Sequence, residues 1–173
     1  LGLTLFSLFA LACSGGGSES SGSTDGGTSS VSATGSASIF LTDAPSDLFD
    51  EILVTIRAVE LLGEDGPVNI FTGRETVDLK QLENFSDLFV YADEVPVGTY
   101  QKIRLSVDAV ELVTGYEVIQ VEPPANGKID LLPRSKFAIR EGVNLVIEID
   151  MDARKSIHTV GTGRGKYKFH PVV

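Results

Sequence analysis

The chain has 173 residues, enough for one domain with appendages, and its net charge is −10 because 24 Asp and Glu outnumber 14 Lys and Arg. An acidic surface repels phosphate backbones, so we expect no nucleic-acid partner. The single cysteine excludes an intrachain disulfide, and without Trp the chain lacks the commonest side chain for stacking on sugars.

Residues 1–12 read LGLTLFSLFALA, an uncharged apolar run that is too short to span a bilayer. The run fits the apolar core of an export signal, and the missing initiator Met and cationic start indicate truncation at this end. Two cleavage patterns remain open. Ala10-Leu11-Ala12 fits ordinary signal peptidase, and the same residues followed by Cys13 resemble a bacterial lipobox.

A lone cysteine directly before a Ser/Gly tract favours lipidation of Cys13, because a free thiol is a liability in an oxidising compartment. Ser14 in place of Asp favours the outer membrane or cell surface. The tract that follows is a tether of roughly 25–30 Å that lacks the apolar surface needed to fold. We therefore predict a signal peptide over 1–12, a lipidated Cys13 plus tether over 13–36, and a domain over 37–173.

From Ala37 onward, apolar and polar residues alternate and turn residues recur, which indicates strands. The one helical candidate is short, Lys80–Leu88. This pattern predicts an all-β, Ig-like or transthyretin-like β-sandwich of short, mostly antiparallel strands with at most one short helix. The expected strands are Ser38–Thr42, Glu51–Leu62, Val68–Phe71, Glu75–Leu79, Leu88–Ala92, Tyr100–Val113, Tyr116–Val121, Lys128–Leu132, Lys136–Ile139, Val143–Ala153, Ile157–Val160 and Lys166–Val172.

Three segments share the pattern apolar, polar, apolar, charged, Ala: residues 54–58, 105–109 and 149–153. The first two continue identically as Val-Glu-Leu, so the apolar phase resumes one residue late. One extra residue is typical of a β-bulge, and we expect bulges near Ala58 and Ala109.

Five segments carry a resemblance to a known family: IFLTDAPSD (39–47), ILVTIRAVEL (52–61), VPVGTYQKIRL (95–105), EIDMDA (148–153) and FHPVV (169–173). Together they resemble a bacterial domain-of-unknown-function family, number 4382, over residues 36 to 173. The resemblance implies a secreted or lipid-anchored β-sandwich behind a Ser/Gly tether, and it implies no activity. The last strand is expected to run on beyond residue 173.

Motifs for nucleophilic or zinc chemistry are absent from the sequence. It contains no G-x-S-x-G motif, and its cysteine lies outside the domain. His158 and His170 occupy polar-alternating positions, which predicts solvated strand faces. Residues 161–166, GTGRGK, lack the first glycine of a phosphate loop and precede a strand, so a hairpin turn is expected.

Carboxylates are the remaining candidates for chemistry. Asp43, Asp47 and Asp50 crowd the loop LTDAPSDLFDE, where turn and capping roles are expected. The same three offer oxygen ligands for calcium, although their spacing is not that of an EF-hand. Asp150 and Asp152 share one strand face and are candidates for glycoside hydrolysis.

We therefore expect a non-catalytic binding or structural module, anchored through its N-terminal lipid, that engages an envelope polysaccharide, a protein or other envelope material. Apart from calcium, no cofactor is expected. The alternative is an envelope hydrolase, or its accessory subunit, that uses Asp and Glu. A deep cleft with two carboxylates about 5–9 Å apart favours the alternative, and a flat closed sandwich favours the module.

Overall fold

The computed structural model describes residues 32–44, 47, 49–160, 166–170 and 172, which all belong to one compact unit. The predicted all-β fold is confirmed. Its helices are short: η1 (Leu79–Leu82), η2 (Pro124–Gly127) and α1 (Ala153–Ser156). The strands are β1 (Thr34–Asp43), β2 (Glu51–Gly63), β3 (Gly66–Asp78), β4 (Asp87–Pro96), β5 (Gly98–Thr114), β6 (Glu117–Val121), β7 (Lys128–Leu131), β8 (Phe137–Ile139), β9 (Asn144–Met151), β10 (Ile157–Thr159) and β11 (Tyr167–Phe169).

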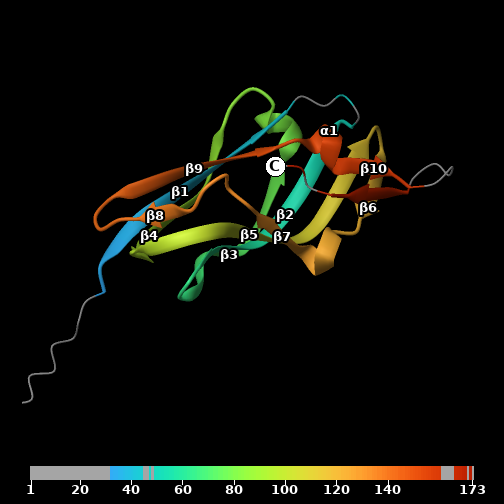
Figure 1. Cartoon of the computed structure of the whole chain (residues 1–173). Coiled ribbons are helices and arrows are strands. Elements are labelled where there is room, and N and C mark those ends of the chain that lie inside the picture. The colour runs from blue at the N-terminus through green and yellow to red at the C-terminus, as the bar shows by residue number, and fades with distance from the viewer. Residues whose placement is uncertain (1–31, 45–46, 48, 161–165, 171, 173) are drawn as a thin grey trace, which may run out of the picture. The chain divides into compact units, whose positions relative to one another are not determined.

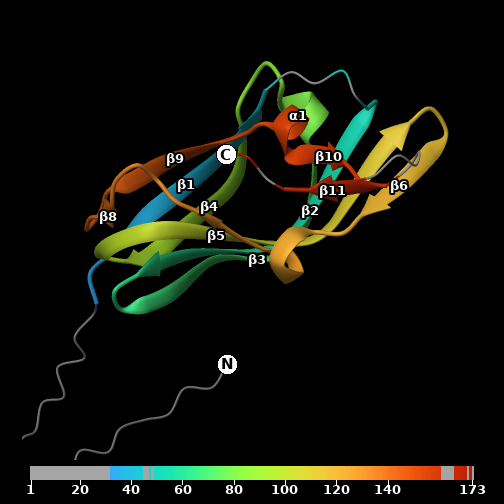
Figure 2. The ribbon, with the colours of Figure 1, turned by 45° about the vertical axis from the view of Figure 1, so that its right-hand side comes forward.

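Two main sheets form the sandwich. The smaller has the order β4-β1-β9, with β1 antiparallel to β4 and parallel to β9. The larger has the order β3-β2-β5-β6, and β7 and β8 pair with the remaining length of β5. The small sheet β10-β11 lies beside β6, at the end of the molecule away from β8 (Figures 1 and 2). Among the described residues, no helix is long and apolar enough to cross a membrane.

Alternate residues of the strands fill the core between the sheets. In β2, Ile52, Val54 and Ile56 are buried, and the buried phase then moves by one residue to Val59 and Leu61. A strand places alternate side chains on opposite faces, so the shift requires an extra residue. The pairing of β2 with β5 skips one residue on each strand, between Ile56 and Ala58 and between Val107 and Ala109. The predicted bulges near Ala58 and Ala109 are confirmed.

The same irregularity crosses the whole large sheet. In β3 the register skips Gly73 and Arg74 opposite the β2 bulge. On the other side, η2 interrupts the strand that runs back along β5 as β6 and β7. Gly127 ends η2 with φ +80°, and a Cβ there would clash with the carbonyl oxygen of Val107. We call this row the bulge line; it runs through Gly73, Arg57, Asp108 and Gly127.

Three expected boundaries are wrong. The expected gap between the strands Val68–Phe71 and Glu75–Leu79 is absent, because a bulge absorbs Gly73 and Arg74 and β3 stays paired with β2 on both sides of it. The expected helix Lys80–Leu88 is only the 3-10 turn η1, and β4 begins at Asp87. The expected strand to Ala153 stops at Met151, because the Asp152 side chain accepts from the Lys155 N–H and starts α1.

The segment PVGTY builds a corner of the sandwich. The buried Tyr100 donates its hydroxyl hydrogen bond to the Pro96 carbonyl over 2.9 Å. Its ring stacks on Phe137 of β8 at a centroid distance of 5.9 Å. A tyrosine bonded to backbone a few residues upstream is a known corner device of β-sandwiches.

Candidate functional site

A groove opens where the chain crosses from one sheet to the other. β3 ends the large sheet and β4 ends the small one, and η1 joins these two edge strands. The hollow inside this crossing has a volume of about 410 Å³, within the range of small-ligand sites. The lining combines apolar, acidic and amide side chains: Leu41, Leu53, Glu75, Thr76, Val77, Asp78, Gln81, Leu82, Phe85, Asp87, Leu88 and Phe89. We call this hollow the β3–β4 groove.

A bulge in β4 shapes one end of the groove. β1 pairs Ile39 with Val90 and Phe40 with Leu88, so the register skips Phe89. A bulge re-aims the side chain of its extra residue. The Phe89 ring contacts Phe71 of β3 with centroids 5.2 Å apart. This pair bridges the two sheet edges where the groove ends.

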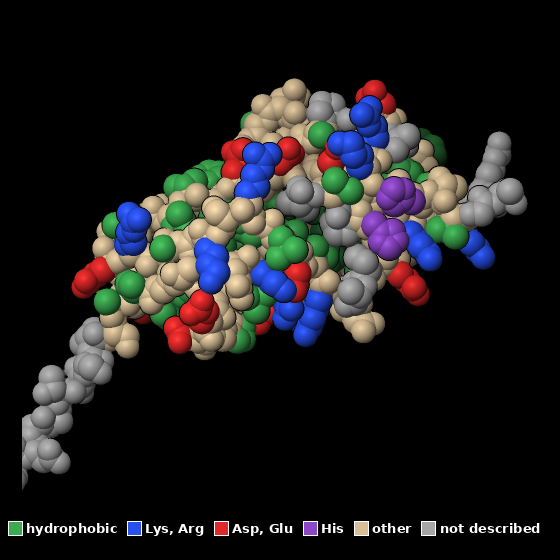
Figure 3. Space-filling model, viewed as in Figure 1, with side chains coloured by type: hydrophobic (Ala, Val, Ile, Leu, Met, Phe, Trp, Pro, Cys, Tyr) green, Lys and Arg blue, Asp and Glu red, His purple; other side chains and the backbone are tan. Residues whose placement is uncertain are grey.

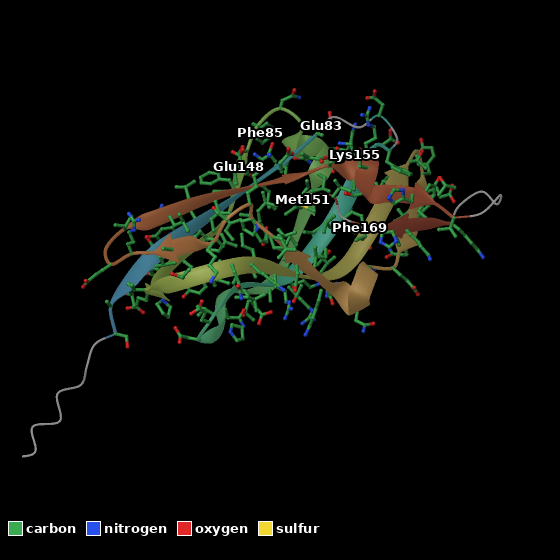
Figure 4. The ribbon with its side chains drawn as sticks, viewed as in Figure 1. Glu83, Phe85, Glu148, Met151, Lys155 and Phe169 are labelled. Carbon is green, nitrogen blue, oxygen red and sulfur yellow. The ribbon has the colours of Figure 1, made fainter. Side chains whose placement is uncertain are left out.

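The rim of the groove carries large apolar side chains that folding leaves in water. Phe85 is 56% exposed and Leu88 is 50% exposed. Figure 4 shows Phe85 on the outside of the molecule, between η1 and β4. Exposed apolar groups beside a hollow are typical of an interaction site.

The carboxylates of the groove have different roles. Asp78 accepts from the N–H groups of Ile52 and Lys80 and from the Gln81 amide, so its oxygens hold η1 and β2 in place. Glu75 and Asp87 are exposed on β3 and β4. The described residues of the lining include no Lys or Arg, so this part of the groove is acidic as well as apolar.

The structure separates the three predicted calcium ligands. Asp43 Oδ1 accepts from the Ala153 N–H at 2.8 Å, and Asp50 Oδ2 accepts from the Gly115 N–H at 2.6 Å. Asp47 is exposed, and its charge acts on Lys80. In the described part of the chain, no three His, Cys, Asp or Glu side chains could together hold a metal. Calcium binding at this loop therefore stays a prediction without a visible cluster.

Asp43 is a buried carboxyl at the end of β1. It is 4% exposed, and its Oδ2 has no hydrogen-bond partner. Burial raises its pKa to about 6, and the nearby charges of Asp152 and Glu83 act in the same direction against the backbone hydrogen bonds. Its position ties β1 to the start of α1.

Three of the segments that carried the resemblance meet at this end of the sandwich. Asp43, from IFLTDAPSD, accepts from Ala153 at the end of EIDMDA. The Asp152 N–H donates to the Val172 carbonyl, and the Val172 N–H donates to the Ser156 hydroxyl. These hydrogen bonds tie the end of β1 to α1 and to the segment that follows β11.

Comparison with protein families supplies the relationship. A family model described as "Domain of unknown function (DUF4382)" matches residues 34–171. The chain belongs to the DUF4382 family. No curated protein and no solved structure matches it.

The remaining predicted site residues of this DUF4382 domain fall into three groups. Cys13 lies outside the described residues. Asp152 caps α1 and pairs with Lys155, which lowers the pKa of its carboxyl, while Asp150 is exposed on β9. His158 and His170 are exposed on the small sheet, with ring centroids 5.9 Å apart.

Sequence reasoning missed the β3–β4 groove of the DUF4382 domain. The available signal was the unbroken apolar run Leu88-Phe89-Val90, which breaks strict alternation as the segments at Ala58 and Ala109 do. The run indicates a bulge. It does not indicate that Phe89 meets Phe71, because that contact joins two sheets.

Proposed function

We propose that this DUF4382 domain is a non-catalytic binding module of the bacterial cell envelope, and that its ligand lies in the β3–β4 groove. The observation that carries this proposal is the hollow at two sheet edges with Phe85 and Leu88 exposed at its rim. Edge strands offer unpaired backbone groups, and extended peptides commonly bind by adding to them.

Charge selects among the ligands that fit. Glu75 and Asp87 flank apolar walls, and no Lys or Arg is among the lining residues that the structure describes. An extended protein segment that alternates apolar with Lys or Arg side chains satisfies both features. We therefore place a protein partner ahead of an envelope polysaccharide.

The hydrolase alternative receives less support from the same groove. A carboxylate pair for glycoside hydrolysis needs an acid and a base that are free to exchange protons with the substrate. Asp78, the carboxylate at η1, already accepts from Ile52, Lys80 and Gln81, and Asp87 accepts from the N–H of Leu88. Among the described carboxylates of the lining, this leaves only Glu75 without a hydrogen bond. Asp152 likewise caps a helix.

Anchoring belongs to the same proposal. A lipid on Cys13 and a Ser/Gly tether would hold the domain close to the outer membrane or the cell surface. A module that only binds needs no cofactor, and its location determines which partners it can reach.

Photocrosslinking in intact cells tests the groove. A benzoylphenylalanine replacing Phe85 is expected to capture a protein, which mass spectrometry of the crosslinked peptide identifies as a segment with apolar and basic residues. The matched control places the same photoprobe at Tyr116, which is fully exposed on the turn between β5 and β6.

Glu75→Lys with Asp87→Lys should abolish the crosslink at position 85 and leave the melting temperature of the domain unchanged. Equal capture at positions 85 and 116 would rule out the groove as a specific site. Capture of glycan instead of peptide would replace the protein partner by a polysaccharide.

A further inference from the structure

The charges of this acidic chain are strongly segregated. Residues 153–173 contain five of the 14 Lys and Arg and none of the 24 Asp and Glu. Both histidines of the chain also fall in this stretch. The end of the domain built from α1, β10 and β11 is therefore basic, although the whole chain carries −10.

Strand alternation sorts these side chains onto one face. Ile157 of β10 pairs with Phe169 of β11, and both are buried against the core. His158 pairs with Lys168, so these two side chains point away from the core. Lys166 and His170 lie two residues on either side of Lys168 and share its direction.

We define the basic face as His158, Lys166, Lys168 and His170. All four are exposed, and Figure 3 shows the two histidines side by side with Lys and Arg around them. Arg154 on α1 adds an exposed cation next to β10. Within the described residues, Lys166, Lys168 and Arg154 form no ion pair, whereas Lys155 is paired with Asp152.

We propose that the basic face docks on a membrane surface through the phosphates of anionic phospholipids. This inference rests on the proposed membrane anchor at Cys13. A tether of roughly 25–30 Å keeps the domain within reach of the lipid surface. A sheet face with unpaired ammonium groups complements the phosphate groups of a lipid surface.

The expected binding of the domain to the membrane is weak and depends on how the domain is oriented. Each Lys or Arg near an anionic surface contributes about fivefold to membrane partitioning. The acidic remainder of the domain is repelled by the same surface, so docking requires this face to point at the lipid. Salt screens both effects within about 10 Å at 0.1 M, so binding should weaken steeply as salt rises.

Vesicle cosedimentation tests the proposal with the compact unit, residues 31–173, whose core is complete without the tether. We expect it to bind vesicles of 60% phosphatidylcholine and 40% phosphatidylglycerol at 50 mM salt, and to ignore pure phosphatidylcholine. Lys166→Glu with Lys168→Glu should lower binding at least about 25-fold, since two contacts of about fivefold each are lost. The matched control, Arg134→Glu with Arg140→Glu, makes the same charge change at exposed positions elsewhere and should bind nearly as the parent does.

Three outcomes overturn the proposal. They are equal binding to both vesicle types, an equal loss in the control variant, and binding to a soluble polyanion such as heparin but not to anionic vesicles. The last outcome would assign the face to an acidic polysaccharide. Because residues 31–173 do not include Cys13, the result is independent of whether Cys13 is acylated.

Discussion

At the scale of single residues, Asp43 makes the stability of the domain depend on pH. Its carboxyl is buried with one oxygen unpartnered, and its pKa is raised from 3.8 to about 6. The folded state therefore binds more protons than the unfolded chain between these two pH values. The protonated form is compatible with burial, and the stability that it gives is lost as pH rises through about 6.

Asp43→Asn should remove this dependence, because the amide keeps an acceptor for the Ala153 N–H and carries no charge. Relative to the variant, the parent's free energy of unfolding should fall by about 2–3 kcal/mol between pH 4 and pH 7. Urea unfolding at pH 4, 5, 6 and 7 measures the difference.

Asp152→Asn provides a control of opposite sign, since the Lys155 hydrogen bonds lower the pKa of Asp152. Loss of the Asp152 carboxylate should lower the free energy of unfolding at neutral pH, and the decrease should become smaller as pH falls. If the free energies of unfolding of the parent and of Asp43→Asn change with pH in parallel, burial does not shift the pKa of the Asp43 carboxyl.

At the scale of elements, the bulge line accounts for an irregularity shared by the strands of the large sheet. The central strands β2 and β5 bury apolar side chains in the core both before and after this line. η2 lies against β5 at this line, where Gly127 packs against the backbone of Val107. The contact needs both a left-handed backbone and the absence of a Cβ.

Gly127→Ala should therefore destabilise the domain by well over the ~1–2 kcal/mol that a left-handed backbone costs alone, because the new Cβ meets the backbone of Val107. Gly142→Ala is the matched control: φ is +65° there, and nothing lies within 4 Å of the added Cβ. Chemical denaturation of both variants separates strain from clash. Equal losses would mean that η2 moves away from β5 at little energetic cost.

At the scale of the whole molecule, the proposed attachment through Cys13 would decide where both surfaces act. Full-length protein should incorporate a clickable palmitate analogue in cells, and Cys13→Ala should lose the label because the only thiol is gone. Ser14→Ala keeps the thiol and should keep the label. Labelling that persists in Cys13→Ala would leave secretion without an anchor.

The parts of the fold that could be predicted are those that depend on the local alternation of apolar and polar residues. The phase shifts after Ile56 and Val107 reveal the bulges, because the side-chain period of a strand is two. The parallel pairing of β1 with β9 leaves no comparable mark, since Ile39 would be buried beside any apolar strand. For the same reason the groove was missed, as its walls come from the edges of two sheets.

Acidic residues were harder to assign than apolar ones. Asp43, Asp47 and Asp50 are close in sequence, yet two of them serve hydrogen-bond donors 65 and 110 residues away in the chain. A carboxylate that caps a distant backbone N–H looks, in sequence, like one that binds a cation. Only the fold distinguishes these roles.

The central position of β1 has a consequence for how the chain becomes folded. β1 is the first strand to emerge during synthesis, yet its partners are β4 and β9, and the Ser38–Asn144 contact closes a span of 106 residues. The sheet β4-β1-β9 cannot be completed until β9 has been synthesised, and such non-local pairing folds slowly. We expect this sheet to be completed late in synthesis, which would suit the proposed export, because threading through a narrow channel requires a chain that has not finished folding.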